Sequence, residues 1–441
     1  MGNLYKLALL FTAAAMMCSW TGCVPDDTDN DGVPDDADRC LTIAGPKINS
    51  GCPVIPQVKK IHLYLDNSAS MEGYYKDLTE YKNIIADLAV KMDRQIKPVD
   101  ISFIAHNTIA YSKNITEFTK DLATTSMAVQ KSSELQRMIK DVTDHCGDHD
   151  VSLLVSDCIL SFPDDDIKAN PEVNVQNASS TLKNNIYTTF IDLKKRGFAA
   201  SIYGFRSKFF GTYYDYQNQK TKLVGALRPF YIWVIAKRPI LLLFNAGLDS
   251  ISSFKPEHAL HFGLLSQPVT NYTILPEMER VGDWVKSPSG ISDVELPKGR
   301  SIQVGLVLNL ENLPAYAKSI SYLQSNLAVK AASCKAGFII KPKDAVDRSR
   351  LKAESQVTAF ENATHALILT ISDMSLSQSE IHFNLPLKYD TWYKDWSTMN
   401  DKGNQFEPGK TFALEHLING VKEAYETPNS NYIDFSLLLT K

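Results

Sequence analysis

The segment that decides the fold is residues 59–70, KKIHLYLDNSAS. Its apolar residues Ile61, Leu63 and Leu65 stand at every second position, which is the period of a β-strand. The strand runs directly into residues 66–70, DNSAS, where a carboxylate and two hydroxyls occupy alternate positions. Alternate side chains of an extended turn face the same side. The segment therefore predicts a buried strand that ends in a turn rich in oxygen ligands.

Predicted helices and strands alternate along residues 58–250. Helices are expected over 73–92, around 135–142 and over 181–195, and strands over 99–105, 151–155, 199–205 and 230–235. Such alternation is typical of α/β proteins in which helices cover both faces of a parallel sheet. We therefore expect a doubly wound parallel sheet in this part of the chain.

A second aspartate, Asp157, follows the buried strand over 151–155. Ligands of parallel sheets bind beyond the carboxyl ends of the strands, so Asp66 and Asp157 are expected to meet at one edge. Carboxylate and hydroxyl oxygens are ligands that hard divalent cations prefer. The alternative is structural: Ser68 and Ser70 would cap the following helix, and Asp157 would be a turn residue.

The pattern Asp66-x-Ser68-x-Ser70 with a later strand-end Asp157 resembles the metal-ion-dependent adhesion site of von Willebrand factor A domains. The resemblance covers residues 58–250 by motif and order. It implies Mg²⁺ (or Mn²⁺ or Ca²⁺) at the site, with Thr125 beside Thr124 in the place of the family's threonine ligand. It also implies an open coordination position that an acidic group of a partner fills.

Residues 27–38, DTDNDGVPDDAD, carry oxygen ligands at alternate positions and glycine at the sixth. Calcium loops use this spacing, with a sharp turn at the glycine, a carbonyl at the seventh position and a carboxylate at the twelfth. The ligands would be Asp27, Asp29, Asp31, the Val33 carbonyl and Asp38.

With the cysteines that follow it, this loop resembles a thrombospondin type 3 repeat over residues 26–53. Cys40 and Cys52 lie in one short segment that contains Gly and Pro, where a disulfide forms readily. The alternative is an acidic linker that binds no metal.

The first 22 residues have the pattern of a signal peptide. Lys6 precedes an apolar run over 7–17, which is shorter than the roughly 20 residues of a transmembrane helix. Thr21-Gly22-Cys23 resembles the lipobox of bacterial lipoproteins, which implies that Cys23 is acylated and anchors the chain. The acidic pair 26–27 resembles the signal that sends Bacteroidota lipoproteins to the cell surface. Plain secretion with an unmodified Cys23 is the alternative.

Residues 256–441 contain long runs of period two, over 302–310 and 381–387. Strands with one buried face have this pattern, so a β-rich, sandwich-like domain is expected. His258 and His261 would share one face of a helix, but no further ligand stands near them, and we interpret them as surface or core histidines. The aromatic run over 209–216 is interpreted as a hairpin-like insertion on the first sheet, and the alternative is a partner or glycan surface.

The length of 441 residues suggests two or three domains, and the net charge of −4 gives no electrostatic footprint for nucleic acid. The expected parts are a signal peptide over 1–22, a lipidated calcium linker over 23–57, an α/β domain over 58–250 and a β-rich domain over 256–441.

These features predict an outer-membrane lipoprotein, on the surface or the periplasmic face, that binds a protein or glycan partner through a divalent-cation site. One alternative is a metal-dependent hydrolase that uses Asp66 and Asp157, for which His62 or His106 would have to manage protons. Another is a structural spacer of the envelope whose metal site is degenerate. No motif points to a catalytic residue.

Overall fold

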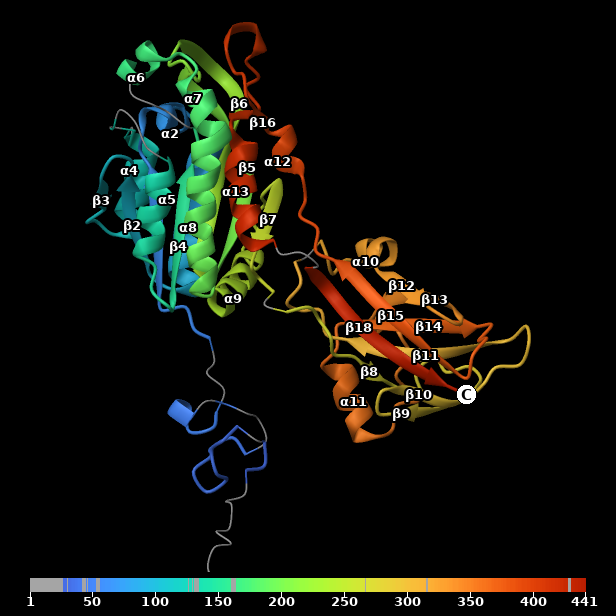
Figure 1. The fold of residues 1–441 in the computed structure, drawn as a ribbon. Helices are drawn as coiled ribbons and strands as arrows, with labels where there is room; N and C mark the ends of the chain where they lie inside the picture. The colour runs from blue at the N-terminus through green and yellow to red at the C-terminus, as the bar shows by residue number, and fades with distance from the viewer. Residues whose placement is uncertain are drawn as a thin grey trace, which may run out of the picture. The chain divides into compact units, whose positions relative to one another are not determined.

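The computed structural model describes residues 27–441 apart from 30, 42–44, 46, 53–55, 126, 129, 131–134, 160–163, 266, 315 and 427–429. The chain forms two compact units, Met1–Gln57 and Val58–Lys441 (Figure 1). The expected signal peptide and Cys23 lie outside the described residues. In the part of the chain that is described, no helix has both the length and the apolar character needed to cross a bilayer.

The first half of the larger unit is built on a sheet of seven strands in the order β3-β2-β1-β4-β6-β5-β7. The strands are β1 (Lys60–Asp66), β2 (Val99–Ile104), β3 (Thr108–Ala110), β4 (Asp150–Ser156), β5 (Phe198–Tyr214), β6 (Lys220–Lys237) and β7 (His258–Phe262). Strands β2, β1 and β4 are parallel, whereas β3, β6 and β7 each run antiparallel to a neighbour. The sheet is therefore mixed, and the expectation of a parallel sheet was wrong in this respect.

The reason is the direct connection of β5 to β6. These strands form one long antiparallel hairpin, and β6 rather than β5 lies beside β4. A short turn allows only an antiparallel pair, whereas a parallel pair needs a long crossover. The aromatic run over 209–216 lies in this hairpin, as expected.

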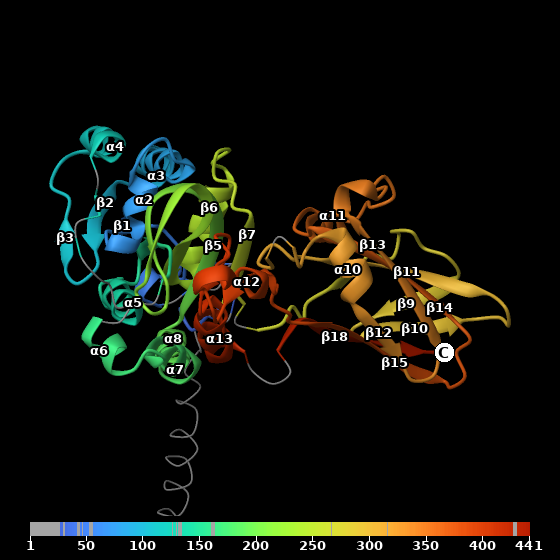
Figure 2. The ribbon, with the colours of Figure 1, turned by 90° about the horizontal axis from the view of Figure 1, so that it is seen from above.

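Helices cover both faces of the sheet (Figure 2). They are α2 (Glu72–Tyr75), α3 (Glu80–Lys91), α4 (Ile115–Thr124), α5 (Leu135–Asp144), α6 (Asp164–Ala169), α7 (Val173–Gln176), α8 (Lys183–Lys195), α9 (Arg238–Asp249) and, from the far end of the chain, α13 (Leu414–Tyr425). Helices α3 and α9 bury Tyr81 and Phe244 on one face, and α5, α8 and α13 bury Met138, Phe190 and Leu417 on the other. These two apolar layers hold the strand ends of the candidate site in place.

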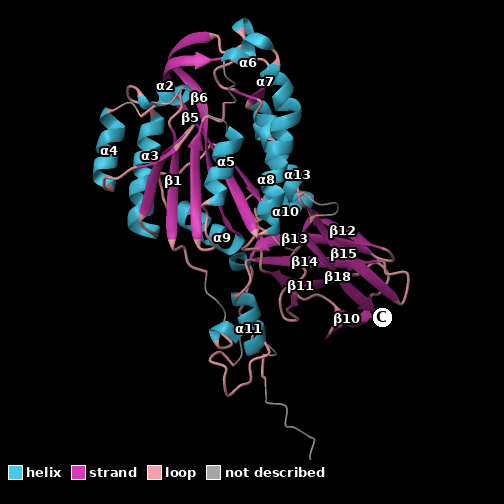
Figure 3. Ribbon diagram, turned by 60° about the vertical axis from the view of Figure 1, so that its left-hand side comes forward, coloured by secondary structure: helices cyan, strands magenta, loops and turns pink. Residues whose placement is uncertain are grey.

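The β5–β6 hairpin extends beyond the part of β6 that pairs with β4, which stops at Tyr231 (Figure 3). Its inner face packs on α2, where the ring centroids of Tyr74 and Phe209 are 5.0 Å apart. Gly211 allows this close approach, because a Cβ there would lie 2.8 Å from the Cα of Gly73. The hairpin thus extends along the side of the edge at which β1 and β4 have their C-terminal ends.

The second half of the chain contains two further sheets that share one apolar core. One has the order β12-β15-β18-β10-β9 and the other β13-β14-β11-β8. Their strands are β8 (Thr273–Ile274), β9 (Asp283–Ser287), β10 (Gly290–Glu295), β11 (Ser301–Leu308), β12 (Ala328–Ala331), β13 (Lys335–Pro342), β14 (His365–Ser372), β15 (Gln378–Pro386) and β18 (Asn431–Thr440), with helices α10 (Ile320–Asn326) and α11 (Glu354–Glu361). Val304, Leu369, Phe383 and Leu437 are buried in that core, which is sandwich-like as the period of two predicts.

Two parts of this second half belong by packing to the first sheet. Strand β7 pairs with β5. The segment that holds α12 (Trp392–Asp395), β16 (Ser397–Thr398), β17 (Thr411–Phe412) and α13 contributes Trp392 and Leu417 to the core under that sheet. Both lie beyond the boundary near residue 256 that composition suggests, because a composition shift does not show where a later segment returns to pack.

Candidate functional site

The two aspartates lie at the same edge of the first sheet. Asp66 is the last residue of β1, and Asp157 directly follows β4. The two strands are parallel neighbours, with Leu65 opposite Val155. Ser68 and Ser70 stand in the turn after β1, around a single 3₁₀ turn over Ala69–Met71. The structure thus brings Asp66, Ser68, Ser70 and Asp157 together at the carboxyl ends of adjacent strands.

Hydrogen bonds connect the four residues, through side chains and through the Ser68 backbone. The Oγ atoms of Ser68 and Ser70 are 3.1 Å apart, and Ser70 Oγ donates to Asp157 Oδ1 at 3.2 Å. Asp66 accepts from the Ser68 backbone N–H at 2.9 Å and from Ser156 Oγ at 2.7 Å. Ser156 was not identified from the sequence as a residue of the site. Its signal is its place as the last residue of a buried strand, directly before Asp157.

Both carboxylates are almost fully buried, each with 1 % of its surface exposed. Burial raises the pKa of Asp66. Burial, and then the negative charge of Asp66, raise the pKa of Asp157 to about 7, against the opposing charge of Arg228. Asp157 Oδ2 is buried and has no hydrogen-bond partner among the described residues. A carboxylate oxygen in that state, beside a second carboxylate and two hydroxyls, fits a divalent cation, which would supply the missing positive charge.

The predicted threonine ligand does not join this group. Thr125 is exposed and caps the C-terminus of α4, and Thr124 Oγ1 donates to the carbonyl of Lys120 at 2.9 Å. No hydrogen bond among described residues connects either threonine to the four side chains. Of the five predicted residues, the structure therefore brings Asp66, Ser68, Ser70 and Asp157 together and leaves Thr125 outside the group.

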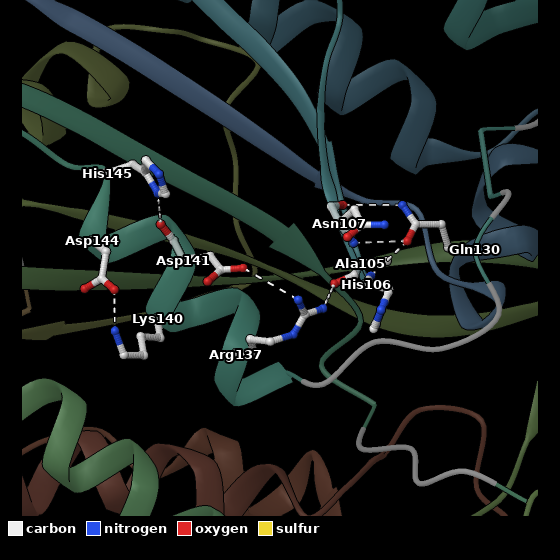
Figure 4. Close-up of polar contacts among 9 residues, drawn as sticks. All are labelled: Ala105, His106, Asn107, Gln130, Arg137, Lys140, Asp141, Asp144 and His145. Atoms are coloured by element: carbon white, nitrogen blue, oxygen red, sulfur yellow. Dashed lines mark hydrogen bonds and ion pairs between the residues drawn. The ribbon is translucent and has the colours of Figure 1, made fainter.

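From the same loop, Gln130 reaches the rim of the site. Its backbone N–H donates to the Asn67 carbonyl at 3.2 Å. Its side-chain oxygen accepts from the backbone N–H groups of His106 and Asn107 at 2.9 and 3.3 Å (Figure 4). The guanidinium of Arg137 also holds this turn, at 2.6 Å from the Ala105 carbonyl (Figure 4). No sequence pattern marks Gln130, because its partners are backbone groups of other loops.

A catalytic set around Asp66 and Asp157 is not evident. His62 is near the start of β1, at the opposite edge of the sheet, where its ring lies 3.7 Å from the carboxylate of Asp150. His106 lies at the correct edge, exposed in the turn after β2. Within the described ranges, no third carboxylate, histidine or cysteine gathers with Asp66 and Asp157 in a cluster of ligand atoms. The site thus offers oxygen atoms of the kind that bind metal ions, but the described residues add no third proton-transfer group to it.

His258 and His261 do not form a metal site. Both lie in β7, and residues three apart on a strand point to opposite faces. His258 stacks on Trp392 with ring centroids 5.0 Å apart. A hydrogen bond of 2.8 Å joins His261 Nδ1 and Ser201 Oγ, and burial lowers the pKa of His261 to about 4. They are packing histidines of the first sheet.

In the N-terminal unit, Asp27, Asp29 and Asp31 place one carboxylate oxygen each within 4.8 Å of the others. Gly32 adopts the left-handed conformation with φ of 84°, and its N–H donates to Asp27 at 2.9 Å. Asp38 instead accepts from the Cys40 N–H at 2.7 Å and lies outside the three-residue cluster. Calcium binding by Asp27, Asp29, Asp31, Val33 and Asp38 stays a prediction.

A disulfide joins Cys40 and Cys52 in the same unit, with their Cα atoms 4.9 Å apart. The other cysteines that the structure describes, Cys146, Cys158 and Cys334, are free thiols. The two cysteines that the sequence pattern favours as a pair are thus the two that the structure joins.

Calcium should protect the N-terminal unit from proteases. Crowded carboxylates repel one another until a divalent charge compensates them, so the loop is expected to order on binding calcium. The measurement is the cleavage rate within residues 26–53 in calcium and in chelator. Asp31→Ala should remove the protection. The matched control Asp36→Ala, an exposed acid at a non-ligand position, should keep it. Equal cleavage in calcium and in chelator would show that the loop is a plain acidic linker.

No known protein family, no curated protein and no solved structure matches this chain.

Proposed function

We propose that the chain is a cell-envelope lipoprotein that binds a protein or glycan partner through a divalent cation. Asp66, Ser68, Ser70 and Asp157 would hold the cation, which is Mg²⁺ or, in its place, Mn²⁺ or Ca²⁺. The cation would keep one coordination position open for an acidic group of the partner. Cys23 would anchor the protein to the outer membrane, and a calcium-bound linker over 23–57 would separate the anchor from the binding domain.

One observation supports this proposal most. Two buried carboxylates and two hydroxyls from separate parts of the chain converge at one strand edge, and Asp157 Oδ2 has no described partner. Burying a charged group without compensation is costly, so a protein rarely keeps such a set for packing alone. When bound, the cation would supply that compensation and polarise the partner's acidic group. Serine caps do not account for the site, since Ser68 makes no side-chain cap bond to the following turn.

Titration of the soluble chain with Mg²⁺, Mn²⁺ and Ca²⁺ tests the proposal. The background should be Asp31→Ala, which disables the N-terminal loop and leaves the strand-edge site as the expected source of binding heat. We expect one cation per chain. A titration without binding heat for any of the three cations, on a chain with native circular dichroism, would refute the proposed site.

A structural spacer with no metal is the second candidate, and a specific residue favours it. Arg228 lies fully buried near Asp157 and offers a positive charge that the protein itself supplies. In that case Arg228 would balance one of the two carboxylates without a cation. The same titration separates the two candidates.

A further inference from the structure

Arg228 on β6 is a fully buried guanidinium that its surroundings hardly satisfy. None of its surface is exposed. Its Nη1 atom is 3.4 Å from the Pro408 carbonyl, and its Nε and Nη2 atoms have no hydrogen-bond partner among described residues. The guanidinium carbon is 4.2 Å from the ring centroid of Tyr213 and 5.7 Å from that of Phe209. Aromatic faces attract the charge but do not replace five hydrogen bonds.

A buried arginine of this kind needs a negative charge nearby, because an uncompensated ion in the interior is strongly destabilising. In the described structure no carboxylate lies within 4 Å of it, so its charge is balanced over a longer distance. Asp157 is such a charge. It directly follows Ser156 on β4, which pairs with Tyr231 on β6, three residues from Arg228. The Arg228 guanidinium opposes the rise in the pKa of Asp157, and against the effect of burial Tyr74, Tyr213 and then Asp157 raise the pKa of Arg228. Charges that are several ångströms apart still interact strongly when both are shielded from water.

Asp401 is the competing partner. Its carboxylate accepts from the Tyr213 hydroxyl and, at 3.0 Å, from the Tyr216 N–H. Each oxygen of the Asp401 carboxylate therefore already has a donor, and the guanidinium lies over the ring of Tyr213. Asp157 Oδ2, in contrast, has none among the described residues. Arg228 and Asp157 thus both have buried polar atoms without a hydrogen-bond partner among the described residues. This favours the Asp66 and Asp157 pair, rather than Asp401, as the negative charge that Arg228 balances.

We propose that Arg228 is the resident counter-charge of the Asp66 and Asp157 pair, and that it gives the cation-loaded site a net positive charge. The inference rests on the proposed function and names the charge state of that site. The two carboxylates outnumber the guanidinium by one. A divalent cation reverses this balance to one positive charge, which one carboxylate of a partner neutralises. Without Arg228, the loaded site is neutral and gains little from an acidic partner.

The test replaces Arg228 with methionine, which keeps an unbranched apolar stem and removes the charged guanidinium, in the Asp31→Ala background. The like charge of Arg228 opposes the cation, so Arg228→Met should bind Mn²⁺ at least about tenfold more tightly than the parent. The conservative Arg228→Lys variant should stay within about threefold of the parent, because it keeps the charge. Parental or weaker Mn²⁺ affinity in a folded Arg228→Met chain would overturn the proposal.

A thermal-unfolding cycle in chelator tests the pairing even where Arg228→Met folds poorly or the parent binds no metal. Arg228→Met leaves two carboxylates without a counter-charge and should lower the melting temperature. Adding Asp157→Asn should recover most of that loss, whereas adding Asp401→Asn should not. Additive effects of Arg228→Met and Asp157→Asn, or recovery by Asp401→Asn instead, would overturn the assignment. Absence of Mn²⁺ binding in the parent would refute the proposed cation site, and this cycle would then test the role of Arg228 independently of any metal.

Discussion

Replacing Cys23 by serine is expected to move the protein from the membrane fraction to the soluble fraction. The proposed anchor is a set of acyl chains on Cys23, and each buried methylene contributes about 0.8 kcal/mol to membrane binding. Two or more acyl chains therefore hold a protein stably at the membrane, and Cys23→Ser removes the residue that would carry them.

The measurement is fractionation of cells that express the full chain, followed by a wash in high salt, which removes proteins held by charge alone. Cys18→Ser is the matched control, since Cys18 lies five residues earlier in the same signal segment and should leave the protein membrane-bound. A Cys23→Ser chain that stays in the washed membranes would contradict the lipid anchor. A parent chain that is already soluble would instead support plain secretion.

The strand edge that carries the candidate site could be predicted from the sequence because two local signals agree. Strand β1 has apolar residues at every second position, and β4 has a nearly continuous apolar run because it is buried on both faces. Both patterns can be identified without knowledge of the neighbouring strands. The last apolar residue of each strand directly precedes a polar residue of the site, which is Asp66 in β1 and Ser156, followed by Asp157, in β4. Parallel order then places both ends at one edge, and the structure has them there.

The direction of β6 could not be predicted in the same way. Its apolar residues, such as Ile232 and Val234, fit a parallel or an antiparallel strand equally well. What decides the direction is the hairpin turn between Tyr214 and Lys220, which holds β6 antiparallel to β5. This matters for the site, because the hairpin places Arg228 of β6 in the protein interior near the strand ends that carry Asp66 and Asp157.

The contacts of Gln130 and Arg228 also could not be predicted from the sequence, and the physical reason is the same for both. Both residues act on partners that are distant in sequence: Gln130 on the backbone of residues 67, 106 and 107, and Arg228 on Asp157 and the Pro408 carbonyl. A hydrogen bond to a backbone group demands no particular residue type at the partner, so it leaves no pattern. An arginine in a strand reads as exposed by default, since its charge is seldom buried.

Asp66→Ala is expected to abolish cation binding at the strand edge and, with it, all metal-dependent partner binding. The substitution removes a charged ligand, and even ligands one shell further out usually change metal affinity by about 10- to 100-fold. We therefore expect the affinity for Mn²⁺ to fall by more than about 100-fold in the Asp31→Ala background. Titration measures this directly, with binding of the membrane-released chain to its partner as the second readout.

The fold should survive this substitution. Burial raises the pKa of Asp66 in the folded chain, so this group costs stability at a pH above the pKa that it has in the unfolded chain. Removing it relieves that cost and offsets the hydrogen bonds lost from Ser156 Oγ and the Ser68 N–H. Asp100→Ala is the matched control, because Asp100 lies on the neighbouring strand at the opposite edge of the sheet. It should leave the Mn²⁺ affinity unchanged.

The possible outcomes separate the candidate functions. Loss of Mn²⁺ binding in a folded Asp66→Ala chain supports the cation site. Unaltered Mn²⁺ binding would mean that other residues bind the metal, and it would refute the site at Asp66. A chain that unfolds on losing Asp66 would show that the carboxylate is needed for its hydrogen bonds to the turn, as the structural alternative requires. Asp66→Asn then decides between ligand and turn residue, since the amide oxygen keeps an acceptor for Ser156 or Ser68 but carries no charge. A turn residue tolerates that exchange, whereas a ligand of a divalent cation does not, because the attraction between the two charges is the larger part of its contribution.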